Sequence, residues 1–138
     1  MSDFASINRT GHRKLRVLLA EQSPALRQRL RKTLDALHSI ETVGEAGSDN
    51  EALELSFRLQ PEVIVLSASL PDQGGFEVLR RIKRSMSNCE VILMSYRPCA
   101  FVQKAGSLLG ATGVCPIEDG FTELRDLLRC TLENRSGE

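Results

Sequence analysis

Polar side chains stand at the ends of several apolar runs in this sequence. Glu21 and Gln22 follow the first run, Ser67 ends the third, and Ser95 follows the fourth. A serine hydroxyl becomes a useful nucleophile when an adjacent base takes its proton, and Glu21 is the only obvious base for Ser67. A single carboxylate also gives a divalent cation too little negative charge to displace its water. These residue types therefore indicate a weak capacity for covalent or metal-dependent chemistry.

Other signatures of catalysis or cofactor binding are missing from the sequence. No GxGxxG follows the first apolar run and no Walker A lysine follows any run, which argues against nucleotide binding by those routes. The four cysteines, at positions 89, 99, 115 and 130, form no CxxC pair. A structural zinc site is therefore poorly supported, and reduced thiols are expected. We expect no catalytic residue, no metal and no other cofactor.

The composition is typical of a single globular domain. The chain has 138 residues, of which 41% are hydrophobic and 26% are charged, as in ordinary folded proteins. Its 18 basic residues balance its 18 acidic residues, which disfavours nucleic acid as a partner because that affinity depends on a basic surplus. No apolar run approaches the roughly 20 residues that span a bilayer, and no secretory signal is visible. We therefore expect a cytoplasmic protein that does not bind membranes.

Short apolar runs alternate along the chain with segments of helical spacing. Ser23 and Pro24 suit the N-cap and the first position of a helix. Ser48 and Glu51 form a capping box at the start of a second helix, which Pro61 ends. The predicted strands are residues 15–20, 40–46, 63–67, 91–94 and 112–115.

This alternation predicts an all-parallel sheet with helices on both faces. Ligands bind such sheets at the carboxyl ends of the strands, where Glu21, Ser67 and Ser95 are expected to lie. Glu62 falls at the opposite end of its strand, and Asp72 is out of register with Ser67, so neither supplies a missing carboxylate. The domain is predicted to span residues 15–132, with flexible tails at 1–14 and 133–138.

Five segments of the chain share a pattern with one protein family. They are LRVLLAEQSPALRQRL (15–30), VGEAGSDNEAL (43–53), PEVIVLSASLPDQGGFEVLRRIK (61–83), EVILMSY (90–96) and LLGATGVCPIEDG (108–120). In this order and spacing they resemble a bacterial response-regulator receiver domain over nearly the whole folded part. The resemblance implies a flavodoxin-like, doubly wound α/β fold with five parallel strands in the order 2-1-3-4-5.

The resemblance also implies a phosphorylation site, which this chain lacks in most of its parts. In receivers an Asp that ends the third strand accepts a phosphoryl group from a histidine kinase, and two acids after the first strand help to hold Mg²⁺. A Thr or Ser after the fourth strand and a Lys after the fifth contact the phosphoryl oxygens. The matching residues here are Ser67 (acceptor), Glu21 and Gln22 (acidic pair), Ser95 (hydroxyl), Ile117 (lysine) and Val114 (the aromatic position of the fifth strand). The chain therefore resembles a degenerate receiver, or pseudo-receiver, with lost or very weak magnesium binding.

In receivers the face formed by the fourth helix, fifth strand and fifth helix commonly mediates dimerisation or partner binding. The apolar candidates on this face are Phe101, Val102, Leu108, Leu109, Val114 and Phe121. We therefore interpret the chain as a non-enzymatic module of a two-component or phosphorelay signalling system. It would act through phosphorylation-independent contacts with partner proteins or with a second copy of itself.

Three alternatives stay open at this point. The chain could be a phospho-responsive regulator with an unusual acceptor, or one that responds to another ligand in the degenerate pocket. It could be a small-molecule or nucleotide sensor at the carboxyl edge of the sheet. Although its length leaves room for no output domain, it could also be the receiver of a longer transcriptional regulator, since NRSGE could begin a linker.

Overall fold

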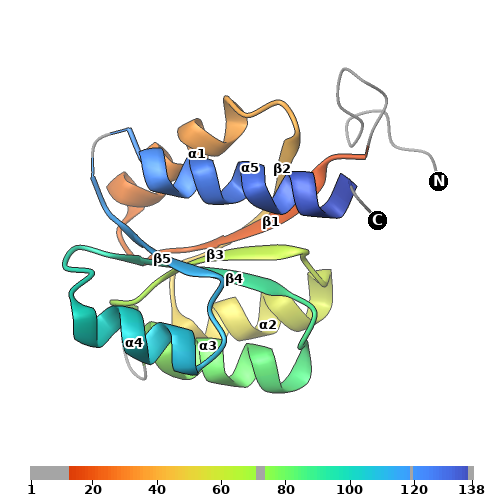
Figure 1. The fold of residues 1–138 in the computed structure, drawn as a ribbon. Helices are drawn as coiled ribbons and strands as arrows, with labels where there is room; N and C mark the ends of the chain where they lie inside the picture. The colour runs from red at the N-terminus through yellow and green to blue at the C-terminus, as the bar shows by residue number, and fades with distance from the viewer. Residues whose placement is uncertain (1–12, 71–73, 119, 137–138) are drawn as a thin grey trace.

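The computed structural model describes residues 13–70, 74–118 and 120–136, which form alternating strands and helices (Figure 1). The strands are β1 (Leu15–Ala20), β2 (Ile40–Ala46), β3 (Val63–Ser67), β4 (Glu90–Ser95) and β5 (Gly113–Pro116). The helices are α1 (Pro24–Asp35), α2 (Asp49–Leu59), α3 (Gly74–Ser85), α4 (Ala100–Leu108) and α5 (Thr122–Ser136). Within these residues, no helix is both long enough and apolar enough to cross a membrane.

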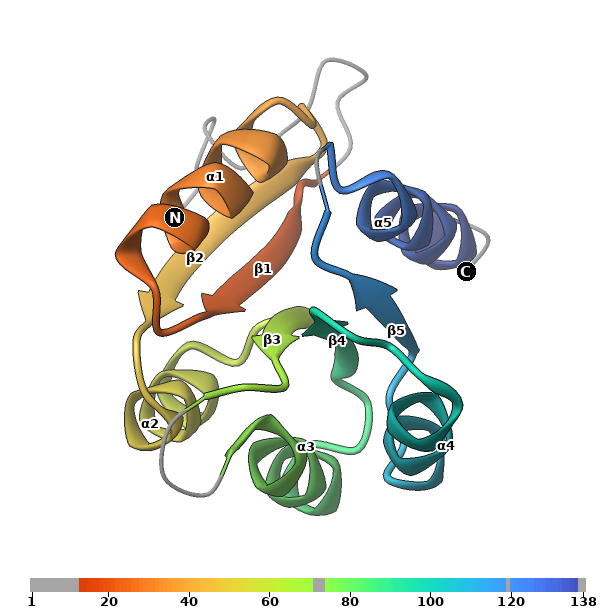
Figure 2. The same cartoon turned by 90° about the vertical axis from the view of Figure 1, so that its left-hand side faces the viewer.

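The strands pair in parallel in the order β2-β1-β3-β4-β5, which confirms the predicted fold class and strand order. Helices α1 and α5 cover one face of the sheet, and α2, α3 and α4 cover the other (Figures 1 and 2). The strand order reverses direction beside β1, because the chain goes from β1 outward to β2 and then back across to β3. Ligand sites of doubly wound folds lie at such a point.

Alternation along the strands divides the core between the two faces. Val17 and Leu19 of β1 belong to the apolar cluster under α1 and α5, whereas Leu18 and Ala20 belong to the cluster under α2 and α3. All of β3 is buried, as expected of a central parallel strand covered on both faces. The sheet is therefore a rigid platform for the side chains that follow its strands.

The predicted capping residues begin their helices. The Ser23 hydroxyl accepts a hydrogen bond from the Leu26 amide, and the Ser48 hydroxyl accepts one from the Glu51 amide. The Glu51 carboxylate also accepts a bond from the Gly47 amide at 2.6 Å, which closes the turn between β2 and α2. Because β1 and β2 each lead directly into a capped helix, the short turns from β1 to α1 and from β2 to α2 are held in defined positions.

The ends of the domain differ from the sequence prediction. Helix α5 continues to Ser136, through residues that the sequence assigned to a C-terminal tail. Arg13, assigned to the N-terminal tail, and Arg135 of α5 both bind the Glu62 carboxylate, which fixes them to the body of the domain. The remaining parts of the two predicted tails, residues 1–12 and 137–138, lie outside the described residues.

Candidate functional site

The residues predicted to form a site follow neighbouring strands at one edge of the sheet. Glu21 follows β1, Ser67 ends β3, and Ser95 ends β4. Ser95 pairs with Pro116 of β5, the residue directly before Ile117. The parallel register therefore brings these positions to a common edge, as the sequence predicted.

Glu21 is almost fully buried, with 3% of its surface exposed. One carboxylate oxygen, Oε2, accepts a hydrogen bond of 2.7 Å from the Ser23 amide. The other oxygen, Oε1, is buried and has no hydrogen-bond partner among the residues that the structure describes. Glu21 therefore shapes the turn from β1 into α1, and its neighbour Gln22 is exposed.

An arginine lies beside this turn. The Arg27 guanidinium donates a hydrogen bond of 2.7 Å to the Glu21 carbonyl oxygen and forms an ion pair of 3.4 Å with Glu45 of β2. The partner Glu45 lies 18 positions further along the chain, on β2. The sequence carries no local signal for this contact.

A second acid, Asp49, is buried at this edge and was not among the site residues predicted from the sequence. Asp49, the first residue of α2, is 2% exposed and follows the end of β2 at the same edge. Its position after Ser48 marked it only as a residue of a helix N-terminus, where acidic side chains are ordinary.

The Ser67 hydroxyl is engaged within its own loop. Ser67 is 2% exposed, its Oγ lies 3.1 Å from the Ser69 Oγ, and it accepts a hydrogen bond from the Ser69 amide. No hydrogen bond joins Ser67 to Glu21 in the described part of the chain, so the one obvious base does not contact the hydroxyl. The arrangement matches a small polar residue that caps the end of a buried strand.

Ser95 and Ile117 complete the edge. The Ser95 hydroxyl accepts a hydrogen bond of 3.1 Å from the Arg97 amide, so it supports the loop after β4. The Ile117 amide donates to the Ser95 carbonyl oxygen at 2.9 Å, and the Ile117 side chain packs against the apolar cluster under α1 and α5. The position that holds a lysine in receivers is therefore occupied here by an isoleucine, whose side chain contacts the core.

The donors at this edge do not suit magnesium. Mg²⁺ prefers several hard oxygen ligands with enough negative charge to replace its water. Among the positions that correspond to the receiver site, Glu21 offers a single carboxylate, Ser67 offers a neutral hydroxyl, and Gln22 is exposed. The second buried acid of this edge, Asp49, belongs to the first turn of α2. Among the described residues there is no group of three or more His, Cys, Asp or Glu side chains placed to hold a metal ion.

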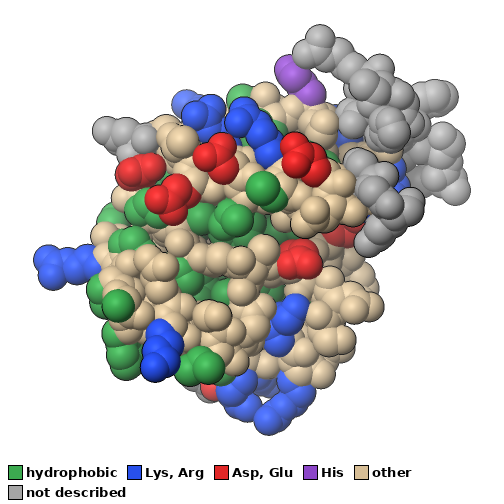
Figure 3. Space-filling model, viewed as in Figure 1, with side chains coloured by type: hydrophobic (Ala, Val, Ile, Leu, Met, Phe, Trp, Pro, Cys, Tyr) green, Lys and Arg blue, Asp and Glu red, His purple; other side chains and the backbone are tan. Residues whose placement is uncertain are grey.

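The predicted partner face is only partly exposed. Phe101 and Leu108 of α4 are each 78% exposed, while Val102, Leu109 and Val114 are half-buried. Hydrophobic side chains gather over α4 and the adjoining part of the sheet edge (Figure 3). In α4 only Gly106 is buried, because a side chain there would collide with Leu93 and Val114.

The sequence prediction for Phe121 was wrong. Phe121 is 2% exposed and belongs to the core cluster under α1 and α5, with Leu124 and Leu128. The turn before α5 directs its ring inward, where the Arg29 guanidinium covers it at 5.1 Å from the ring centre. Phe121 therefore holds α5 to the domain and is not part of an exposed partner face.

Residues 17–116 match the family of response regulator receiver domains. The chain belongs to this family. The match covers most of the chain and includes the strands that carry the candidate site, so the chain is a receiver domain of a two-component response regulator.

The chain is also similar to individual proteins and solved structures. The receiver is 32% identical over 81% of its length to protein-glutamate methylesterase/protein-glutamine glutaminase 1 of Syntrophus aciditrophicus, and 26% identical over 84% to the regulatory protein YxjL of Bacillus subtilis. It spans 32% and 53% of the length of these two relatives.

Among solved structures, the receiver domain of NarL from Mycobacterium tuberculosis has 26% identity and a TM-score of 0.77, covering 91% of this chain and 98% of that one. The CheX-CheY complex of Borrelia burgdorferi, solved with BeF3 and magnesium, has 18% identity and a TM-score of 0.82, covering 92% and 96%. At 18% identity, the similarity to the CheX-CheY complex shows a shared fold.

Proposed function

We propose that this receiver acts in cytoplasmic signalling through protein contacts, without phosphoryl transfer to the end of β3. The observation that carries the proposal is the state of Ser67, a buried hydroxyl bonded to Ser69 at the position where receivers have an Asp. Glu21, the one acid of the pair, is already engaged by the Ser23 amide. Ile117 packs against the core where a cation would meet the phosphoryl group.

Magnesium binding is lost or very weak in this proposal. A phosphoryl group at Ser67 would face neither a bound metal ion nor a lysine, so its charge would stay uncompensated in a buried position. The same reasoning predicts no response to beryllium fluoride, which stands in for a phosphoryl group bonded to a carboxylate.

We expect a titration with beryllium fluoride and Mg²⁺ to leave the amide NMR spectrum of the wild-type chain unchanged. The matched control is the triple variant Gln22→Asp, Ser67→Asp and Ile117→Lys, which restores the charges of a receiver. Because Ile117 is only half-buried, a lysine there packs its stem and reaches the edge with its amine. The triple variant is expected to show shifts at the ends of β1, β3 and β4.

Shifts at Glu21, Ser67 and Ser95 in the wild-type chain would contradict the proposal. They would support the alternative of a pocket that responds to an unusual ligand, which the buried and unpartnered Glu21 Oε1 favours. An unresponsive wild-type chain beside a responsive triple variant would support an inert site on an intact receiver scaffold.

The partner surface that we propose is the exposed part of α4, and its occupant is a second copy of the chain. Phe101 and Leu108 are the largest exposed apolar side chains there, and burial of their apolar surface against a partner would be favourable. The double variant Phe101→Asp/Leu108→Asp is expected to weaken self-association by at least about tenfold, measured by sedimentation equilibrium.

The control for this prediction is Phe57→Asp. Phe57 is also a large exposed apolar residue, but it lies on α2, away from α4. A wild-type chain that stays monomeric, or equal weakening by both substitutions, would exclude a dimer through α4.

A further inference from the structure

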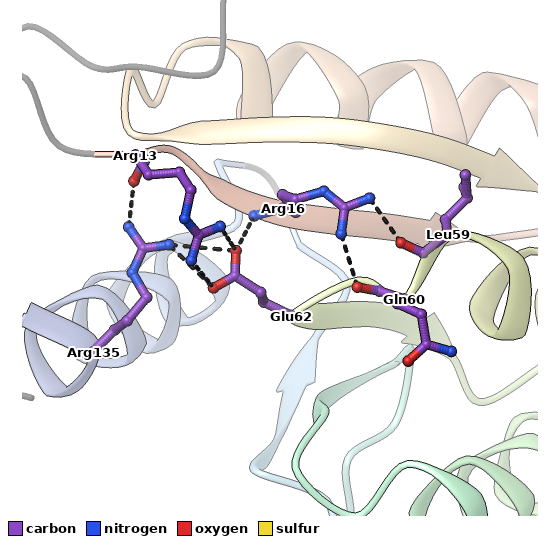
Figure 4. A network of polar contacts seen from close by, with 6 residues as sticks. All are labelled: Arg13, Arg16, Leu59, Gln60, Glu62 and Arg135. Atoms are coloured by element: carbon purple, nitrogen blue, oxygen red, sulfur yellow. Dashed lines mark hydrogen bonds and ion pairs between the residues drawn. The ribbon is translucent and has the colours of Figure 1, made fainter. Parts of the chain in front are cut away.

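Glu62 is the centre of a polar network at the edge of the sheet opposite the candidate site (Figure 4). Its carboxylate accepts hydrogen bonds of 2.9 and 3.1 Å from the Arg13 guanidinium and one of 3.0 Å from the Arg16 amide. The Arg135 guanidinium, near the end of α5, lies 3.2 Å from the same carboxylate. Burial alone would raise the pKa of Glu62, but these bonds outweigh it and hold the pKa below its usual value.

The last turns of α5 make fewer core contacts with the described part of the domain than its first turns do. Leu124 and Leu128 are fully buried, whereas after Leu128 the described part of the helix adds the partly buried Leu132 to this core cluster. Arg135 adds a bond of 2.6 Å to the Arg13 carbonyl oxygen. The exposed residues beyond Leu128 are Arg129, Cys130, Glu133 and Asn134.

These turns also form one wall of a groove of about 1100 Å³. The wall from α5 consists of Leu127, Cys130, Thr131, Asn134 and Arg135. The opposite side comes from the segment before β3, including Glu62, and from residues 85–90 between α3 and β4. The two residues that join the walls, Glu62 and Arg135, therefore both line the groove.

We propose that residues 129–136 are a movable wall of this groove, latched to the sheet by the Glu62 carboxylate. The hinge falls after Leu128, because that residue is the last one of α5 that the core buries completely. When the Glu62–Arg135 contact breaks, the end of α5 leaves the sheet edge and the groove widens. Any molecule in the groove that pairs with Glu62 or Arg135 competes with the latch, so occupancy of the groove and the position of the end of α5 are coupled.

The test is amide hydrogen exchange on the full chain with Glu62→Gln, which removes the charge and keeps the shape. Residues 129–136 are expected to exchange about tenfold faster than in the wild type, while residues 122–128 keep their rates. Arg135→Gln should give the same pattern, and the effects of the two substitutions should not add fully in the double variant, because each of them breaks the Glu62–Arg135 contact.

Glu90→Gln is the matched control. Glu90 lines the same groove on the neighbouring strand, but its carboxylate accepts a hydrogen bond from Thr112 and does not hold α5. Faster exchange spread evenly over all helices in Glu62→Gln would mean general destabilisation and would overturn the proposal. Unchanged exchange at 129–136 would overturn it too, since the Glu62 carboxylate would then not be what holds the end of α5.

Discussion

Phe121→Ala is expected to lower the free energy of unfolding by about 3 to 4 kcal/mol, the usual cost of removing a buried phenyl ring. The ring is 2% exposed and packs in the cluster that joins α1 and α5 to the sheet. Its removal leaves a cavity among side chains that cannot fully collapse, and it also removes the contact with Arg29. Urea unfolding monitored by circular dichroism measures the loss as a lower midpoint.

Phe101→Ala is the control, because it deletes the same atoms from a side chain that is 78% exposed. We expect a change within about 0.5 kcal/mol for the monomer, as for other surface substitutions. Equal losses for the two variants would contradict the assignment of Phe121 to the core and of Phe101 to the surface. The pair thus tests the point at which the structure corrected the sequence prediction.

Gly75→Ala is expected to destabilise the domain by about 3 kcal/mol or more, at the upper end of the cost of overpacking a core. A Cβ at Gly75 would lie 2.2 Å from the Ser67 carbonyl oxygen and 2.8 Å from the Ala68 Cα. Both contacts are with backbone, so no side-chain rotation can relieve them. The start of α3 must then move away from the end of β3, and the amide signals of Ser67 and Ala68 should shift along with the loss of stability.

Gly47→Ala is the matched control at the same edge of the sheet. Its nearest contact would be the Arg27 Nη1 at 3.2 Å, the end of a flexible side chain. We expect a change below about 1 kcal/mol, because the arginine can shift and alanine reduces the entropy of the unfolded chain. If Gly75→Ala were as mild as this control, the close approach of α3 to Ser67 would be wrong.

Much of the fold followed from local patterns. The bounds of β1, β2 and β3 and the caps at Ser23 and Ser48 agree with the sequence predictions. These features depend on residues close together in the chain, such as a serine and the amide three positions later. The smaller differences, a longer β4 and a β5 shifted by one residue, fall within the ordinary uncertainty of element ends.

The sequence could not predict that Phe121 is buried and Phe101 is exposed. Each is an apolar residue near the start of a helix, so periodicity treats them alike. Phe121 is buried because the turn before α5 places it over the face of the sheet that α1 also covers. Phe101 is exposed because the close approach of Gly106 to β4 and β5 turns another side of α4 toward the core.

The residue types that meet at the carboxyl edge of the sheet follow from the sequence, because the strand ends of a parallel sheet share that edge. The parallel arrangement brings Glu21, Ser67 and Ile117 to that edge independently of the contacts that each side chain makes there. Three contacts became visible in the folded chain: Ile117 packs on the core, Arg27 pairs with Glu45, and Glu62 binds arginines 49 and 73 positions away. Contacts across such separations depend on how the crossovers place whole elements, and no local spacing of residues encodes them.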